Sequence, residues 1–261
     1  MTDKPFSPRE LLLRALKSQV DLGMGEVVIR KKRMSARPAT AAASEVEHIV
    51  PIAEALDQPQ RLYEPRRSPT AVLVDPSFDS LESHRTAICE CQLCPLGATR
   101  HKFVYGVGSP AARLIFVGEA PGHDEDLQGE PFVGRAGQLL DRILAAIQLS
   151  RRDIYIANII KCRPPGNRDP LPDEVTKCIP YLREQIRIIR PKLLCALGRI
   201  AAQNLLATTT PLGKLRGKWH EFEGIPLLVT YHPAALLRFP EYKKETWADM
   251  QTLKARYDTV G

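Results

Sequence analysis

Four short apolar runs, each followed by a polar segment and a helical pattern, dominate the chain after its first third. The runs are Leu114 to Val117, Ile154 to Ile160, Leu193 to Leu197, and Ile225 to Thr230. Apolar runs of this length, bounded by glycine and charged residues, predict buried strands. Helical spacing of apolar residues is found over four further ranges, Gly137 to Leu149, Pro172 to Arg190, Arg199 to Leu206 and Pro240 to Tyr257. This alternation predicts an α/β fold with a mainly parallel sheet covered by helices on both faces.

A polar or glycine-rich segment follows each predicted strand. The four segments begin at Gly118 (GEAPG), Asn158 (NIIKCRPPGN), Gly198 (GR) and Tyr231 (YHP). Because parallel strands end at the same edge of a sheet, we expect these segments to converge on one crevice, where such sheets bind ligands. The loop from Gly118 to Gly137 is especially rich, with five glycines, several acids and Phe132. We therefore expect the chemistry to centre on this loop.

The first eighty residues differ in composition from the rest of the chain. They hold eight of the 22 prolines and two basic clusters, at 30–33 and 66–67, with little sustained periodicity. Such a composition is typical of disorder. One helix is predicted inside it, capped by Ser7 and ended by Gly23. We therefore predict a largely disordered N-terminal extension over 1–80 and a folded domain over 81–261.

Composition and charge narrow the class of protein. With 261 residues, 44% hydrophobic and 26% charged, the chain resembles a globular protein with a real core. No apolar run approaches the ~18 residues that span a bilayer, and the N-terminus has no apolar signal core, so we expect a cytoplasmic protein with no membrane partner. The net charge of +7 favours a polyanionic partner.

Six cysteines in a chain without an export signal favour a metal site or reactivity over disulfides. Four of them form two pairs, Cys91 with Cys94 before the first strand, and Cys162 with Cys178 after the second. Four thiolates suit a tetrahedral zinc ion or an iron–sulfur cluster, and their spacing does not choose between these. Cys195 lies inside an apolar strand and is expected to be buried. Cys89 is a nearby thiol that could replace Cys91 as a ligand.

Six motifs in order resemble the family 4, iron–sulfur uracil-DNA glycosylases. They are a Cys-x2-Cys pair, GEAPGHDED, GEPFVGRAGQLLD, NIIKCRPPGNRDP, a second cysteine after fifteen further residues, and HPAALLR. The similarity covers roughly Cys89 to Tyr257. It implies a three-layer α/β/α fold with a central four-stranded parallel sheet, and hydrolysis of the N-glycosidic bond of deoxyuridine that leaves an abasic site. It also implies a [4Fe–4S] cluster with the ligands Cys91, Cys94, Cys162 and Cys178.

The roles that the resemblance implies agree with the chemistry of three side chains. Phe132 matches the aromatic residue that stacks on the extruded uracil. Asn158 matches the amide that reads uracil, because its donor and acceptor suit uracil O4 and N3–H but oppose the pattern of cytosine. His232 matches the histidine that donates to uracil O2 and so stabilises charge that gathers on the leaving base. The sequence leaves the tautomer of His232 open.

The loop after the first strand departs from the best-known branch of the superfamily. That branch has a water-positioning aspartate where this chain has Ala120, and a thymine-blocking tyrosine where it has Gly122. The family 4 pattern places a glutamate at Glu119, which we assign to the water or to the base pocket without deciding between them. Exclusion of the thymine methyl group must therefore come from another residue.

The remaining carried-over residues concern DNA. Leu236 or Leu237 matches the wedge that fills the gap left in the duplex. The helix start from Gly134 to Gln138 offers backbone N–H groups for phosphate. The resemblance thus gives Glu119, Asn158 and His232 as catalytic residues. It gives as substrate-binding residues Gly118, Ala120, Phe132, Asn158, Gly137, Gln138 and Leu236.

Three functions are consistent with these features. The leading one is a monomeric base excision repair enzyme that flips uracil out of single- or double-stranded DNA, with a structural cluster. A broader glycosylase would also remove hypoxanthine or other deaminated bases; Glu119 argues for the narrower enzyme, since a leucine is commoner there in the broader branch. From another class, a non-catalytic nucleic-acid-binding protein would use the cysteines to hold structural zinc or a redox cluster.

Overall fold

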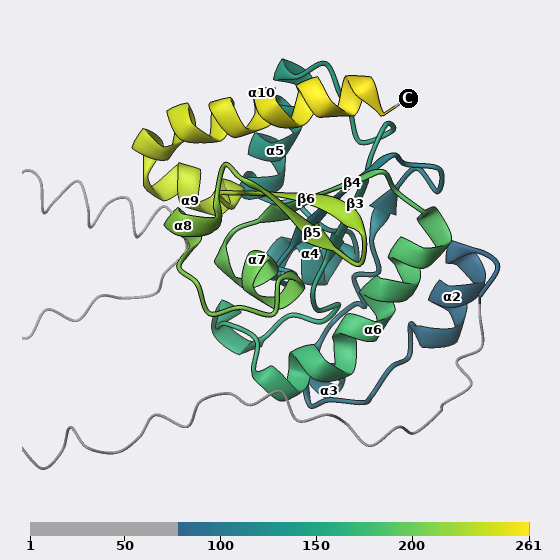
Figure 1. The fold of residues 1–261 in the computed structure, drawn as a ribbon. Helices are drawn as coiled ribbons and strands as arrows, with labels where there is room; N and C mark the ends of the chain where they lie inside the picture. Colours follow the sequence, from purple (N-terminus) through teal and green to yellow (C-terminus); the bar gives the residue numbers. More distant parts are fainter. Residues whose placement is uncertain (1–77, 261) are drawn as a thin grey trace, which may run out of the picture. The chain divides into compact units, whose positions relative to one another are not determined.

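The structure is a computed structural model, and it describes residues 78–260. Figure 1 shows this part in colour. The predicted extension over 1–80 and its helix after Ser7 fall almost entirely outside the described residues, so both remain predictions. None of the helices that the structure describes is long and apolar enough to cross a membrane.

A six-stranded sheet forms the centre of the described residues (Figure 1). In the spatial order β1-β3-β2-β4-β6-β5 its strands are Val107–Gly108, Tyr155–Asn158, Leu114–Gly118, Leu193–Leu197, Ile225–Thr230 and Trp219–Phe222. The four central strands pair in parallel, which confirms the predicted parallel sheet. β1 and β5 extend its two edges in antiparallel orientation. The predicted fold class is therefore confirmed, although the sheet has two more strands than expected.

The two edge strands lack the apolar runs that identify the central strands. β1 has only two residues, both half-buried. β5 has the sequence WHEF, and only its last residue is buried, so it presents no continuous apolar pattern. It joins β6 through Glu223 and Gly224, whose φ angles of 51° and 80° suit a two-residue hairpin.

Helices occupy most of the remaining described residues. The α-helices are α2 Leu81–Ile88, α3 Leu96–Thr99, α4 His123–Gln128, α5 Arg135–Ala146, α6 Pro172–Ile189, α7 Arg199–Leu205, α8 Leu212–Leu215, α9 Pro233–Arg238 and α10 Lys243–Thr259. Two 3-10 turns, η2 and η3, span Pro165–Asn167 and Pro240–Tyr242. The four predicted helices are α5, α6, α7 and α10, with ends shifted by a few residues. The last begins later than predicted, because the residues after Pro240 form the 3-10 turn.

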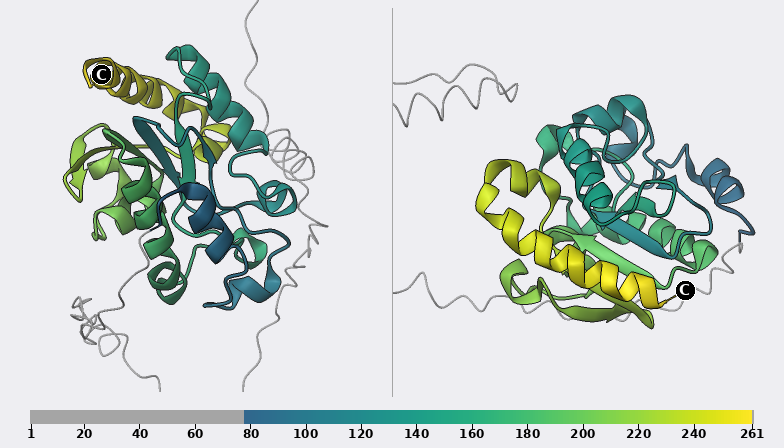
Figure 2. Two further views of the ribbon diagram at one scale, coloured as in Figure 1. Left: turned by 90° about the vertical axis from the view of Figure 1, so that its right-hand side faces the viewer. Right: turned by 90° about the horizontal axis from the view of Figure 1, so that it is seen from above.

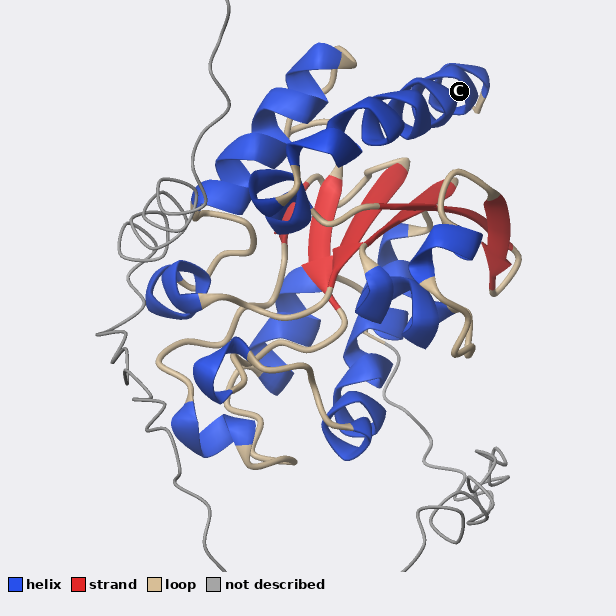
Figure 3. Cartoon of the chain, turned by 90° about the vertical axis from the view of Figure 1, so that its left-hand side faces the viewer, coloured by secondary structure: helices blue, strands red, loops and turns tan. Residues whose placement is uncertain are grey.

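Alternate side chains of the central strands face two helical layers. On one face, Ile115 and Val117 of β2 belong to a core shared with α6 and α7. On the other face, Leu114 and Phe116 belong to a core shared with α5 and α10. Figure 3 shows helices on both sides of the sheet, and both views of Figure 2 show α5 and α10 together on one side. The chain therefore has the predicted three-layer α/β/α architecture.

The register of the parallel strands brings the predicted site segments to one edge. Gly118 and Asn158 are paired residues at the ends of β2 and β3. Leu197 and Thr230 pair at the ends of β4 and β6, so the segment with His232 follows at the same edge. β2 lies between the strands that follow it in the chain, so the strand order reverses there. Open α/β sheets bind ligands at such a reversal.

Candidate active site

Three of the predicted site residues meet at the ends of β2 and β3. A Cβ atom on Gly118 would lie 2.4 Å from Asn158 Oδ1 and 2.7 Å from Phe132 Cζ. Any other residue at this position would therefore displace the amide or the ring. Glycine at the end of β2 lets the two side chains close over the strand.

Asn158 carries an unusual buried polar atom. The residue is 2% exposed. Its Oδ1 is the one buried side-chain nitrogen or oxygen atom in residues 78–260 that has no hydrogen-bond partner. Leaving such an acceptor unpaired costs about 1–3 kcal/mol. This unpaired acceptor lies at the edge where such sheets bind ligands. It is therefore suited to accept a hydrogen bond from a donor on a ligand.

The backbone around Phe132 is held in an uncommon conformation. Phe132 has a positive φ of 56°. Arg151 donates from its guanidinium to the carbonyl oxygens of Pro131 and Phe132. A Cβ on Gly137 would lie 1.7 Å from the Phe132 carbonyl oxygen, so glycine lets α5 begin directly against this loop. Strained backbone that its surroundings hold in place is typical of functional sites.

The carboxylate of Glu125 organises the same loop. It accepts hydrogen bonds from the backbone N–H groups of Gly122, Val133 and Gly134, at 3.1, 2.9 and 3.0 Å. One side chain thus joins the start of the loop to its end. Sequence reasoning assigned no role to Glu125 or Arg151. Glu125 lies inside the GEAPGHDED motif, so the sequence offered a signal for its importance. Nothing in the sequence pointed to Arg151.

His232 lies opposite Phe132, with ring centroids 5.3 Å apart. It caps the N-terminus of α9, where its Nδ1 accepts the backbone N–H of Ala234 at 3.1 Å. Burial lowers the pKa of His232 to about 4, and the positive charge of Arg238 acts in the same direction. The ring is therefore neutral at ordinary pH, with its proton on Nε2. The structure decides the tautomer that the sequence left open: Nε2 is a hydrogen-bond donor.

Glu119 follows β2 directly and has a raised pKa. Burial raises the pKa of its carboxyl group to about 7, and the negative charge of Asp169 adds to this effect. Arg199 and Arg238 oppose it. A carboxyl group with this pKa exchanges protons readily near neutral pH, as a general base or acid does.

The two leucines of α9 differ in exposure. Leu236 is 1% exposed, and it lines an apolar groove with Leu139 and Trp247. Leu237 is 38% exposed. A wedge must reach into the DNA stack, so the burial of Leu236 argues against the residue that the resemblance placed first and favours Leu237. The phase of α9, which one apolar pair does not reveal, leaves only Leu237 of the two at the surface.

The amides at the start of α5 are only partly available to phosphate. Gly134 N–H donates to Glu125, and Gln138 N–H donates to the Gly134 carbonyl at 3.0 Å. The expectation of free N–H groups throughout this stretch therefore needs correction at its two ends. Arg135, Ala136 and Gly137 are the amides here that have no protein acceptor within residues 78–260.

Four free cysteines gather beside the segment after β3. Burial raises the pKa of Cys162 to about 11, and the nearby thiols of Cys94 and Cys91 add to the shift. Burial likewise raises the pKa of Cys178 to about 12, with additions from Cys162 and Cys91. Arg100 joins the two pairs, because its Nη1 donates to the Cys91 carbonyl oxygen at 2.6 Å and to Cys162 Sγ at 3.6 Å. In residues 78–260, no three His, Cys, Asp or Glu side chains converge tightly enough to hold a single metal ion.

The sulfur atoms of this group accept several hydrogen bonds. Tyr181 Oη donates to Cys91 Sγ at 3.2 Å, Arg100 Nη1 to Cys162 Sγ at 3.6 Å, and Lys161 N to Cys178 Sγ at 3.3 Å. Donors aimed at sulfur stabilise thiolates and are a common feature around iron–sulfur clusters. The hydrogen bonding of these three sulfurs, those of Cys91, Cys162 and Cys178, is therefore compatible with cluster ligands.

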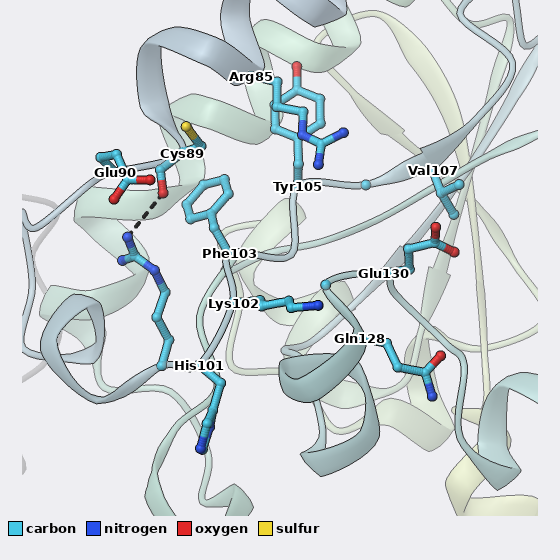
Figure 4. A pocket seen from close by; sticks show the side chains of 13 residues that line it. Arg85, Cys89, Glu90, His101, Lys102, Phe103, Tyr105, Val107, Gln128 and Glu130 are labelled. Atoms are coloured by element: carbon cyan, nitrogen blue, oxygen red, sulfur yellow. Dashed lines mark hydrogen bonds between the residues drawn. The ribbon is translucent and has the colours of Figure 1, made fainter.

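The other two cysteines differ from this group in their surroundings. Cys195 is fully buried in β4, as predicted. Cys89 donates to the Thr86 carbonyl at 3.5 Å and lines a polar cavity of about 470 Å³ (Figure 4). That cavity also includes Arg85 and Lys102, but not Asn158, Phe132 or His232, so it is separate from the candidate base pocket. Cys91 is favoured over Cys89 as a ligand by the hydrogen bond that it accepts from Tyr181, a residue on the same helix as Cys178.

The residues of the base pocket and of the later cysteine pair lie inside a stretch that matches a known family. The family model of the uracil DNA glycosylase superfamily matches residues 105–251, more than half of the chain. The chain belongs to this superfamily. The prediction made from the motifs is therefore confirmed at the level of the family.

Several curated relatives are named type-4 uracil-DNA glycosylase. The protein from Archaeoglobus fulgidus is 46% identical over 184 residues, which cover 67% of this chain and 92% of the relative. The protein from Saccharolobus solfataricus is 43% identical over 186 residues, 68% of this chain and 86% of the relative. The protein from Sulfurisphaera tokodaii is 42% identical, over 68% of this chain and 84% of the relative. The match to this chain thus covers most of the length of each of these three relatives.

Proposed function

We propose that the protein is a DNA repair glycosylase that removes uracil from DNA and leaves an abasic site. The observation that carries the proposal is the bare Oδ1 of buried Asn158 beside the Phe132 ring, in a member of the uracil DNA glycosylase superfamily. The names of the curated relatives support it. The same site would act on uracil in single- or double-stranded DNA, with the protein as a monomer.

Asn158 reads the base. Its Oδ1 accepts the uracil N3–H, and its amide nitrogen donates to uracil O4. Cytosine has an acceptor at N3 and a donor at the fourth position, so it would leave both polar groups of the buried amide unpaired. Phe132 supplies the ring face on which the flipped uracil stacks, which offsets part of the stacking lost when the base leaves the duplex.

His232 stabilises the leaving base. As the glycosidic bond breaks, negative charge gathers on uracil O2, and the Nε2–H of the neutral ring donates to that oxygen. The Ala234 N–H holds the tautomer, so the donor needs no reorganisation during the reaction. Removal of one such donor typically slows the chemical step about 10²–10³-fold.

Glu119 acts on the water that completes hydrolysis. Its raised pKa allows its carboxylate to take a proton from water near neutral pH, and its position after β2 puts it at the same edge as Asn158. This assigns Glu119 to the water, one of the two roles that the sequence left open. The glycosidic bond breaks with its electron pair going to uracil, the sugar receives the hydroxyl group, and the proton held on Glu119 balances the negative charge of the departing base.

The contacts to DNA come from α5 and α9. The amides of Arg135, Ala136 and Gly137 at the start of α5 are suited to one phosphate. Leu237, exposed on α9 five residues after His232, fills the gap that the flipped nucleotide leaves. Phosphate contacts position the duplex, and the wedge keeps the base extruded.

Cys91, Cys94, Cys162 and Cys178 hold a [4Fe–4S] cluster in this proposal, as the motif resemblance implies. When bound, the cluster supplies a structural cross-link between the segment before β1 and the segment after β3. The hydrogen bonds from Tyr181, Arg100 and Lys161 to the sulfurs support this ligand set. Uracil excision itself needs no metal, because the pocket side chains bind the base and stabilise its charge.

A single assay separates this function from the alternatives. Purified protein is incubated with an oligonucleotide that carries one uracil, and the product is treated with alkali to cleave abasic sites. We expect cleavage at the uracil position and none in matched oligonucleotides with cytosine or thymine. Cleavage at hypoxanthine as well would indicate a broader glycosylase. Binding without cleavage would indicate a non-catalytic nucleic-acid-binding protein.

A further inference from the structure

Lys161 has a fully buried ammonium group. The residue is 0% exposed, and its Nζ donates to the Asn158 carbonyl oxygen at 3.0 Å and to Gln185 Oε1 at 2.6 Å. Within residues 78–260, no carboxylate lies within ion-pair distance of this group. Buried charges are normally paired, so the location of the balancing charge is informative.

The nearest groups that can carry a balancing negative charge are two cysteine thiols. The backbone N–H of Lys161 donates to Cys178 Sγ at 3.3 Å, and Cys162 is the next residue in the chain. The backbone of Lys161 therefore contacts a predicted cysteine ligand. Its side chain contacts Asn158, at the end of β3.

A chain of buried hydrogen bonds holds the ammonium group from the other side. Gln185, on α6, donates from Nε2 to the Tyr105 carbonyl at 2.9 Å and to the Tyr155 hydroxyl at 3.2 Å. Gln185 is itself 0% exposed. Because each member has a partner, the ammonium cannot turn away from Asn158 without leaving a buried group unpaired.

We propose that Lys161 is a positioning residue that couples the cysteine group to the base-reading end of β3. A filled cysteine site fixes the backbone of Lys161 through its N–H contact to Cys178, and the ammonium fixes the Asn158 carbonyl. That contact sets the direction in which the Asn158 side chain meets the base. The inference rests on the proposed function for its catalytic consequence, but its structural part concerns only the chain.

The substitution that tests the coupling is Lys161→Met in the full chain with its cluster. Methionine keeps a long apolar side chain in the buried space but removes the charge and the donors. Lys192→Met is the matched control, because Lys192, just before β4, is exposed and its side chain has no hydrogen-bond or ion-pair partner among residues 78–260. Iron content, amide hydrogen exchange and single-turnover excision of uracil are measured for each variant.

The proposal predicts a local effect in Lys161→Met. Iron content stays at the wild-type level, and exchange accelerates at the amides of Ile159 and Ile160, which donate to the Gly118 and Glu119 carbonyls. Exchange in β4 is unchanged. The single-turnover rate falls ~10-fold or more, the scale of a lost contact behind a binding residue, while affinity for abasic-site DNA is unchanged. Lys192→Met behaves as wild type in all three measurements.

Three results would overturn the coupling. One is wild-type exchange at Ile159 and Ile160 in the variant. Another is uniformly faster exchange throughout the sheet, which would indicate a general structural role. The third is loss of iron, which would make Lys161 part of the cluster site alone. If the wild-type protein does not excise uracil, the proposed function fails, and the exchange data still decide the coupling.

Gln185→Met provides a second variant if Lys161→Met does not fold. It keeps the charge but removes one acceptor of the ammonium, so the ammonium is held less firmly against the Asn158 carbonyl. We expect the same two amides to exchange faster than in wild type, by a smaller factor, with full iron content. Unchanged exchange at both amides in Gln185→Met would contradict the proposal.

Discussion

The base pocket and the cysteine group lie on either side of one segment, 158–162. They differ in whether their acceptor atoms have hydrogen-bond partners. In the pocket, the buried Asn158 Oδ1 has no partner within the described residues. In the cysteine group, donors from Tyr181, Arg100 and Lys161 point at sulfur atoms. An unpaired buried acceptor is suited to a ligand with a neutral donor, whereas sulfurs supplied with donors are suited to thiolates. In the proposed function this difference corresponds to two ligands of different chemistry, a base and a cluster.

The largest effect is expected from a substitution in the cysteine group. Cys162→Ser should abolish cluster binding and lower solubility, because the cluster joins two segments of the fold. Purified wild-type protein should be brown with about four irons per chain, and the variant should be colourless. Cys89→Ser is the matched control and should keep its iron. A cluster retained in Cys162→Ser but lost in Cys89→Ser would refute the ligand assignment.

The next largest effect concerns His232. His232→Ala should slow single-turnover excision about 10²-fold or more, because it removes the donor to charge that appears only in the transition state. Affinity for uracil-containing DNA should stay near the wild-type value, as measured by titration at fixed salt. A wild-type rate in folded variant protein would move this electrostatic role to another donor.

The pKa of Glu119 predicts a pH profile. Below pH 7 its carboxyl group is largely protonated, so the single-turnover rate should rise as pH increases through about 7. His232 remains neutral over the same range, because its pKa is about 4. Glu119→Gln should lower the plateau and remove the inflection near pH 7. A profile with the same inflection in Glu119→Gln would assign it to another group.

The same shift affects stability. Because the folded-state pKa of Glu119 is raised, its stabilising contribution is greatest below the ordinary pKa of a glutamate and is lost as pH rises through about 7. Thermal unfolding should therefore show a decline in stability across this range that is weaker in Glu119→Gln. Equal declines in both proteins would indicate that the carboxyl is more solvated than its surroundings suggest.

The smallest effect is expected from the N-terminal extension. A chain that begins at Phe78 keeps the hydrogen bonds of that residue with Glu184 and Arg187. Its single-turnover rate at saturating DNA should equal that of the full chain. Its affinity should fall mainly at low salt, because the removed basic clusters contribute phosphate contacts. Loss of the chemical step in folded, brown protein would show that the extension supports the active site.

Sequence patterns predicted the central strands and the meeting of the site segments. Apolar runs fix which segments are buried, and the parallel arrangement then brings Asn158 and His232 to one edge. The half-exposed hairpin strand β5 escaped detection because only Phe222 of its residues is buried. The N-terminal extension remains a prediction.

Details within the site depended on three-dimensional contacts. The tautomer of His232 follows from its distance to the Ala234 N–H, and the choice of Leu237 over Leu236 follows from the rotation of α9. Lysine is rarely buried, so no sequence rule placed Lys161 behind Asn158. Arg151 also lay outside every motif, although it holds the Phe132 backbone.

The most direct test of the account is whether Asn158 reads the base. Single-turnover excision from uracil-containing DNA is measured for wild type, Asn158→Ala and the control Asn204→Ala, which alters a partly buried asparagine on α7. The account predicts a loss of ~10²-fold or more and weaker binding of uracil-containing DNA in Asn158→Ala alone, because uracil N3–H and O4 lose their partners in a buried site. Wild-type rates with unchanged preference for uracil over cytosine in Asn158→Ala would contradict it.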